Sequence, residues 1–199
     1  IAGSVVAKYL APSNITNIGI IGTGTQARFQ LQYLKHVTNC RSVYVWGRSS
    51  ESIKKFQKNM KNSDYSIKTT ENIEDITNNC NFIVTTTSSI SPLLFVQQIR
   101  PGTHITAMGA DRKGKQELDP YILQKADIIV ADSKKQCIEY GDISHAIAKK
   151  LIKENNVFEL GTFIKSGASR ENDRQITVAD LTGVAVQDIQ IAKIIQDGI

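Results

Sequence analysis

A glycine-rich turn between an apolar run and an amphipathic stretch constrains this chain more than any other feature. Residues 17–21 favour a β-strand, which stops at Gly22 and passes through Gly24 toward a helical pattern. A G-x-G-x-x-G/A pattern in this strand–turn–helix context predicts a dinucleotide-binding turn. Gly22 permits the tight turn, Gly24 has no Cβ to keep a pyrophosphate from the backbone, and Ala27 lets the helix pack closely on the strand. The first N–H groups of the helix then face the phosphates. The alternative is a tight turn without a ligand.

Apolar runs that favour strands alternate with helical patterns along the chain. The expected strands are 17–21, 42–46, 66–69, 81–86, 104–108, 128–131 and 176–180. The expected helices are 26–37, 51–59, 73–78, 120–125, 134–140, 144–153 and 183–196, and residues 1–10 also have a helical pattern. This alternation predicts an α/β fold with a doubly wound parallel sheet, the Rossmann arrangement.

The same elements suggest a division of the chain into three parts. We expect residues 1–16 to form a linking helix and loop, and residues 17–160 to form the dinucleotide-binding domain. Residues 161–199 are expected to supply a strand and a helix that pack on that domain or return toward a substrate domain. The chain has no initiator Met and begins inside an expected helix, so we interpret it as a piece of a longer protein.

Composition places the chain among globular proteins. It has 199 residues, of which 41% are hydrophobic and 22% charged. No apolar run approaches the ~20 residues that span a bilayer, and no signal peptide is recognisable, so we expect a cytoplasmic protein without a membrane partner. The net charge of +5 is scattered over helices, which argues against a nucleic-acid groove. The three cysteines lack metal-site spacing, so reduced thiols and no metal are expected.

The end of the second expected strand bears on the choice of dinucleotide. NAD-preferring folds place an acid about 20 residues after the glycine turn, where it accepts hydrogen bonds from the ribose. The run Trp46-Gly47-Arg48-Ser49-Ser50 carries no acid at that place. An arginine beside two hydroxyls suits a 2′-phosphate, so Arg48 and Ser49 predict NADP(H) in preference to NAD(H). The alternative is an exposed arginine without a ligand.

The fourth expected strand ends in a cluster of hydroxyl side chains, the run Thr85-Thr86-Thr87-Ser88-Ser89. Ligands in open α/β sheets bind beyond the carboxyl ends of the strands. Thr86 and Thr87 are therefore expected to line the dinucleotide crevice. Threonine also favours strands, so the alternative is that one or two of them serve only the sheet.

Asp111 follows the fifth expected strand on the same rim. An acid at this place can face the nicotinamide and carry protons to or from a substrate nitrogen or an attacking water. The alternatives are a loop cap or a salt bridge with Arg112 or Lys113. Asp180 and Asp188 are closer acid–base candidates, because the expected helix start at Thr182-Gly183 can face the crevice; Asp180 is first interpreted as a strand-end or cap residue. The histidines His36, His104 and His145 show no partner spacing and are expected to be structural.

Further motifs follow in a fixed order. They are Gly22-Thr23-Gly24-Thr25-Gln26-Ala27, Pro101-Gly102-Thr103-His104-Ile105, Gly109-Ala110-Asp111 leading to Gly114-Lys115-Gln116-Glu117-Leu118, Glu159-Leu160-Gly161, Gly167 with Arg170, and the run 176–188. In the order and spacing of these motifs, the chain resembles the ornithine cyclodeaminase/μ-crystallin family over nearly its whole length.

The resemblance implies a homodimer with a Rossmann domain and a second domain formed mainly by the N-terminal part of the chain. Family members bind NAD(H) or NADP(H) and act on amino acids or their imines, as cyclodeaminases, alanine dehydrogenases or ketimine reductases. It also implies that Asp111 is the catalytic aspartate. The cofactor contacts that it implies are Thr25, Gln26, Met108, Gly109, Lys115 and, at the ribose, Arg48.

Two departures from the family accompany the resemblance. Leu181 stands where the family often has Ser, and the family's substrate-carboxylate Arg and Lys lie upstream of residue 1. The substrate and dimerisation domain is therefore expected to be largely absent from this chain, which is then incomplete as a catalyst.

These features predict an NAD(P)-dependent enzyme that transfers hydride between nicotinamide and the α-carbon of a small amino acid or its cyclic imine. One alternative is a non-catalytic protein of the μ-crystallin type that binds NADP(H) or a small ligand. Another is a different Rossmann dehydrogenase whose substrate domain is missing.

Overall fold

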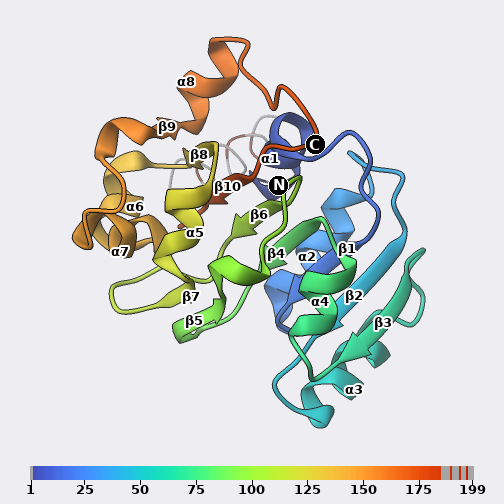
Figure 1. Cartoon of the computed structure of the whole chain (residues 1–199). Coiled ribbons are helices and arrows are strands. Elements are labelled where there is room, and N and C mark those ends of the chain that lie inside the picture. The colour runs from blue at the N-terminus through green and yellow to red at the C-terminus, as the bar shows by residue number, and fades with distance from the viewer. Residues whose placement is uncertain (1, 185–188, 190–192, 194–195, 197–199) are drawn as a thin grey trace.

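A wholly parallel sheet forms the centre of the computed structural model, which describes residues 2–184 together with 189, 193 and 196 (Figure 1). Its strands are β1 (Ile18–Ile21), β2 (Ser42–Trp46), β3 (Ser66–Thr70), β4 (Phe82–Thr85), β6 (His104–Ala107), β8 (Ile128–Ala131), β9 (Val157–Glu159) and β10 (Thr177–Asp180). They lie in the order β3-β2-β1-β4-β6-β10-β8-β9. Two short strands, β5 (Ile90–Leu94) and β7 (Gln116–Leu118), pair in a separate sheet. The doubly wound parallel fold expected from the sequence is confirmed.

Helices cover both faces of this sheet, as Figure 1 shows. They are α1 (Ala2–Leu10), α2 (Thr25–Leu34), α3 (Ser50–Asn59), α4 (Glu74–Asn79), α5 (Pro120–Lys125), α6 (Lys134–Tyr140), α7 (Asp142–Ala148) and α8 (Leu160–Lys165). Alternate residues of β1 serve the two faces: Ile20 packs with Leu31 of α2, whereas Ile21 packs with Ile76 of α4. None of the described helices is long and apolar enough to cross a membrane.

All seven strands expected from the sequence are present, with ends that differ by a residue at most. The strands β5, β7 and β9 and the helix α8 were not expected, because each is short and β5 contains Pro92.

The expected helix 26–37 is wrong at its end. After Leu34 the amides of His36 and Val37 bond to carbonyls three residues back, which tightens the chain into a turn. Most of the expected helix 183–196 lies outside the described residues.

The expected helix 144–153 is wrong at both ends, since α7 spans Asp142–Ala148. It stops because Lys150 takes a positive φ of 59° and the amide of Leu151 bonds back to the carbonyl of Ala146. This is the left-handed cap that closes many helices, formed here without glycine.

The strand β10 lies between β6 and β8 rather than at an edge of the sheet. Its residues Thr177, Val178, Ala179 and Asp180 are all buried. The hydroxyl of Thr177 donates to the carbonyl of Leu10 at the end of α1, over 2.8 Å. The described part of segment 161–199 therefore completes the interior of the sheet and fastens α1 to it.

Candidate functional site

The glycine turn follows β1 at the carboxyl edge of the sheet. Gly22 has a φ of +121°, which side chains rarely permit. A Cβ on Gly22 would lie 2.6 Å from the hydroxyl oxygen of Thr86 and 3.0 Å from its carbonyl oxygen. Gly22 also donates its N–H to the carbonyl of Trp46 over 2.9 Å. The turn is therefore held between the ends of β2 and β4, where only glycine fits.

The second glycine of the motif borders open space. Gly24 is the N-cap of α2, it is exposed, and no described atom lies within 4 Å of the place where its Cβ would be. No side chain caps the first turn of this ten-residue helix among the described residues, and its residues Thr25 and Gln26 are exposed. Ala27 is fully buried against the sheet. Unpartnered amides at a helix N-terminus attract anions, so this cradle fits a diphosphate.

The end of β2 lies against the same turn. A Cβ on the buried Gly47 would come within 2.9 Å of the Thr23 methyl carbon. Arg48 and Ser49 follow directly and are exposed. The Ser49 oxygen accepts the Ser52 N–H over 3.3 Å and so caps α3. Its hydroxyl proton is still able to donate to a ligand.

The two predicted threonines have different surroundings. Thr86 donates its hydroxyl to the carbonyl of Ile21 over 3.2 Å and lies against Gly22. Thr87 points the other way, since its N–H and its hydroxyl both donate to the carboxylate of Glu117, over 2.5 and 2.7 Å. Both donors of Thr87 are thus engaged within the protein.

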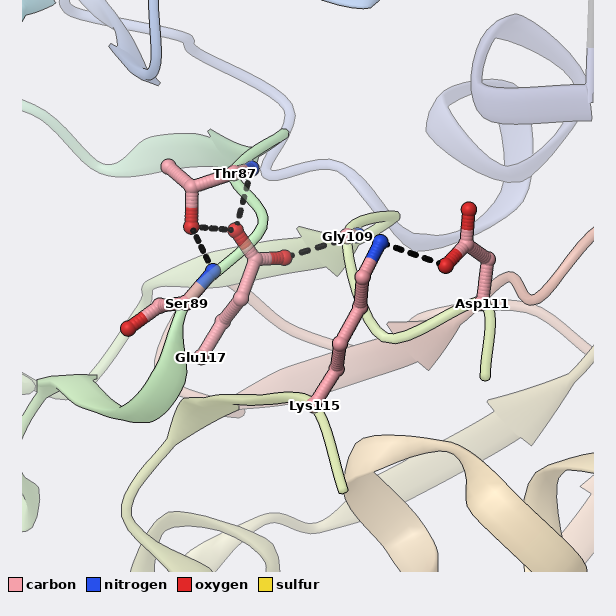
Figure 2. Close-up of polar contacts among 6 residues, drawn as sticks. All are labelled: Thr87, Ser89, Gly109, Asp111, Lys115 and Glu117. Atoms are coloured by element: carbon pink, nitrogen blue, oxygen red, sulfur yellow. Dashed lines mark hydrogen bonds and ion pairs between the residues drawn. The ribbon is translucent and has the colours of Figure 1, made fainter. Parts of the chain in front are cut away.

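Asp111 lies on an exposed loop after β6, beside Lys115 (Figure 2). The Lys115 Nζ is 2.6 Å from the Asp111 Oδ1; the lysine side chain is 12% exposed and the aspartate 55%. The expected alternatives for the ion pair, Arg112 and Lys113, are wrong, because the partner is four residues away. Met108 is half-buried at the start of this loop.

Glu117, on β7, is a residue whose place the sequence did not indicate. It is fully buried, and it also accepts the Thr85 hydroxyl over 2.6 Å. A further bond, from the Gly109 N–H over 2.7 Å, is drawn in Figure 2. The sequence contains Glu117 as an acidic residue inside the Gly114–Leu118 motif. The sequence does not indicate which donors a charged residue on a short strand will contact.

Asp142 and Asp180 extend this buried acidic group. Asp142 Oδ1 accepts the N–H groups of Glu117 and Leu118 over 2.9 and 2.8 Å, whereas its buried Oδ2 has no partner among the described residues. Burial, and next the Glu117 carboxylate, raise the pKa of Asp142 to about 7. Asp180 is the last residue of β10, the expected strand-end position, and it accepts the Ile143 N–H in the first turn of α7 over 2.9 Å.

Replacement of Asp142 by asparagine is expected to stabilise the protein at alkaline pH. The native pKa of Asp142 lies above the unfolded value of about 3.9. At a pH between these two pKa values, Asp142 is protonated in the native state and ionised in the unfolded state. Its contribution to the free energy of unfolding is therefore lost as pH rises through about 7. Asparagine keeps the acceptor for both amides without a charge facing Glu117 and Asp180. Thermal melting should show Asp142→Asn above the unaltered protein by about 3 °C or more at pH 8. The difference should shrink toward pH 5; a constant difference would contradict this origin.

The three histidines have different surroundings. His104 is fully buried, with Nδ1 2.7 Å from the Thr177 hydroxyl and Nε2 2.9 Å from the Thr106 hydroxyl. Burial, and next the charge of Arg170, lower its pKa to about 3. His145 contacts the Lys115 carbonyl, and His36 is exposed in the turn after α2.

The remaining residues named from the sequence lie in a buried cluster or beyond the described residues. Asp188 lies outside them. Leu181 is buried in an apolar cluster with Leu10 and Phe163. Within the described part of the chain, no three His, Cys, Asp or Glu side chains are arranged to hold a metal ion.

A parallel sheet in this order, with a glycine turn and an uncapped helix N-terminus at its carboxyl edge, defines a Rossmann-like protein of the dinucleotide-binding class. The model of the ornithine cyclodeaminase/mu-crystallin family matches residues 1–199. The chain belongs to this family.

Three comparisons relate the chain to characterised proteins. Alanine dehydrogenase of Archaeoglobus fulgidus is 38% identical over 98% of this chain and 61% of its own length. The solved archaeal alanine dehydrogenase dimer with bound NAD is 38% identical with a TM-score of 0.91, over 98% of this chain and 61% of that one. The Δ(1)-pyrroline-2-carboxylate reductase of Thermococcus litoralis, solved with NADH and L-proline, is 32% identical with a TM-score of 0.91, over 96% and 60%. The chain thus spans about three fifths of the length of these proteins.

Proposed function

We propose that this chain is the dinucleotide-binding part of an NAD(P)-dependent oxidoreductase that interconverts a small amino acid and its imine. The observation that carries the proposal is the position of Asp111. Its exposed carboxylate follows β6 at the same edge of the sheet as the open cradle at Gly24. Relatives named alanine dehydrogenase and pyrroline-2-carboxylate reductase support this class of reaction.

In this proposal the glycine turn and the first amides of α2 bind the diphosphate, with Thr25 and Gln26 beside it. Thr86, Met108 and Gly109 line the rim toward the nicotinamide, which supplies or accepts the hydride when bound. Asp111 carries the proton to or from the substrate nitrogen. Lys115 holds the Asp111 carboxylate over 2.6 Å and so orients it.

The test uses the full-length gene product with NADH or NADPH and one candidate substrate at a time. Oxidation of the dinucleotide with pyrroline-2-carboxylate, piperideine-2-carboxylate, or pyruvate plus ammonium supports the proposal. Ammonia release from ornithine without net dinucleotide consumption places the protein among cyclodeaminases instead. Tight dinucleotide binding without any turnover would refute an enzyme and favour a ligand-binding protein.

Arg48 is expected to favour NADPH over NADH. Its exposed guanidinium follows β2 beside the glycine turn, with the Ser49 hydroxyl next to it and no acid to repel a 2′-phosphate. Replacement by alanine should weaken NADPH binding about tenfold, the effect of one charge-assisted contact, and leave NADH binding nearly unchanged. Fluorescence titration with both dinucleotides measures this. An equal loss for both would assign Arg48 to the adenine, and no loss for either would show that Arg48 contacts no ligand. The solved relatives with NAD and NADH make this comparison necessary.

A solved relative supports a proposal for the assembly. We propose a homodimer, because the archaeal alanine dehydrogenase is a dimer in its solved structure. We also propose a cytoplasmic location. The segments 1–16, 17–160 and 161–199 remain our proposed division of the chain, with β10 of the third segment seated in the sheet of the second.

A further inference from the structure

Glu117 closes the loop that carries Asp111. The carboxylate oxygen Oε2 accepts the N–H of Gly109, eight residues earlier, over 2.7 Å. Between these two points the chain runs through the Asp111–Lys115 ion pair, and residues 111–114 are exposed. Figure 2 shows the carboxylate of Glu117 between Thr87 and Gly109, with the Asp111–Lys115 ion pair on the other side of Gly109. One buried side chain thus joins both ends of an otherwise exposed segment.

The same carboxylate fastens the loop to the neighbouring strand. Thr85 at the end of β4 donates its hydroxyl to Oε2 over 2.6 Å, and Thr87 donates its N–H and hydroxyl to Oε1. A Cβ on Gly109 would collide with the Thr87 carbonyl oxygen and with the Glu117 carboxylate, so the three segments are in close contact. The ends of β4 and β6 border the crevice in this fold. The sheet itself pairs β4 with β6, and Glu117 joins the segments that follow these two strands.

We propose that Glu117 is a positioning residue that sets Asp111 and Lys115 against the nicotinamide side of the crevice. This rests on the function proposed above and deepens it. Glu117 itself is fully buried and touches neither dinucleotide nor substrate. It acts through Gly109, whose backbone leads directly to Asp111.

A carboxylate is required because of the donors that surround it. Four hydrogen bonds converge on its two oxygens, and two of them come from backbone N–H groups that cannot turn away. Glutamine has the same shape but replaces one oxygen with an amide NH₂. In either orientation that NH₂ faces the N–H of Gly109 or of Thr87. One of the two hydrogen bonds from the backbone N–H groups of Thr87 and Gly109 is then lost in a buried site.

Asp142 provides a matched control in the same buried acidic group. Its Oδ1 alone accepts two amides, and Oδ2 has no described partner. An asparagine at this position would keep both hydrogen bonds, so Asp142→Asn makes the same chemical change as Glu117→Gln without opening the loop. Thr85→Val is a second test variant: it removes one hydroxyl from Oε2, keeps the side-chain shape, and lies inside the sheet.

The experiment compares kcat, KM, the dinucleotide dissociation constant and the pH profile of kcat in the full-length protein with its imine substrate. Glu117→Gln should lower kcat at least tenfold and shift the apparent pKa in the pH profile of kcat that reports the proton transfer. Its dinucleotide dissociation constant should stay within threefold of the unaltered protein's value. Thr85→Val should lower kcat by a smaller factor, and Asp142→Asn should keep kcat within twofold. Unchanged kcat and pH profile in Glu117→Gln, or an equal loss in Asp142→Asn, would overturn the proposal. If Glu117→Gln fails to fold, Thr85→Val decides: full kcat there overturns it.

A readout without turnover separates this proposal from the proposed function. Hydrogen exchange at the amides of Thr87 and Gly109 should accelerate in Glu117→Gln and not in Asp142→Asn. An unaltered protein that binds dinucleotide but reduces no imine refutes the proposed function and the catalytic consequence together. Exchange that stays slow in Glu117→Gln refutes the loop closure by itself, whatever the activity.

Discussion

A Gly24→Asp variant is expected to fold normally and to bind dinucleotide about 100-fold more weakly. Gly24 has ordinary extended backbone angles, and a Cβ there would lie in open space apart from its chain neighbours, so a side chain can be added. Aspartate is also among the best N-cap residues, and its charge suits the positive end of α2. The same carboxylate would occupy the amides offered to the diphosphate and repel it. Two charge-assisted hydrogen bonds lost at about 1.5 kcal/mol each correspond to this factor.

The measurement is fluorescence titration with NADH and NADPH beside thermal melting of the same preparations. Gly22→Ala is the contrasting variant: its Cβ would collide with Thr86 at a φ of +121°, so it should lose stability as well as binding. Gly24→Ala should show a smaller loss of affinity than Gly24→Asp. Undiminished affinity in Gly24→Asp would remove the diphosphate from this turn and with it the proposed function.

An Asp111→Asn variant is expected to lower turnover about 10²- to 10⁴-fold, the usual contribution of a general acid or base. The asparagine side chain has the same size and an oxygen that can accept a hydrogen bond from Lys115. Unlike the carboxylate, it cannot take up or release a proton during turnover. Because Asp111 is exposed on the rim and supports no buried contact, stability should change little. The dissociation constants of the dinucleotides should stay within about threefold, since a proton carrier contributes mainly in the transition state.

Steady-state kinetics and dinucleotide titration of the same protein test this. Lys113→Gln is the control, because it alters the charge of the same exposed loop without touching the ion pair. Equal losses in kcat and in dinucleotide affinity would show that Asp111 binds rather than reacts. Retained turnover would move the acid–base role to another group.

The sheet could be predicted from the sequence because its strands are continuous apolar runs separated by turn signals. Runs such as Ile128–Ala131 are buried on both faces, so they contain no polar residue that would blur the pattern. The order of the strands in the sheet could not be predicted in this way. The position of β10 between β6 and β8 depends on pairing between segments about 50 to 75 residues apart, which periodicity does not report. The end of α7 escaped prediction because Lys150 adopts a glycine-like conformation.

The site was predictable where one residue type serves one purpose. The glycine turn is such a case: Gly22 leaves no room for a Cβ beside Thr86, and Gly24 faces open space. Asp111 was found from its place after a strand, but its partner was assigned to neighbours in sequence rather than to Lys115. Glu117 was missed because its role depends on donors from Thr85, Thr87 and Gly109, which only the fold brings together.

Because β10 comes late in the sequence, the central sheet can be completed only after this strand has been synthesised. Until residues 177–180 emerge from the ribosome, β6 and β8 have no neighbour between them, and each exposes a row of unpaired backbone groups. The first half of the sheet, β3-β2-β1-β4-β6, can assemble while synthesis continues, but the second half must wait for the strand that joins them. Protection of nascent chains from aggregation therefore matters most in the interval between the synthesis of β8 and that of β10.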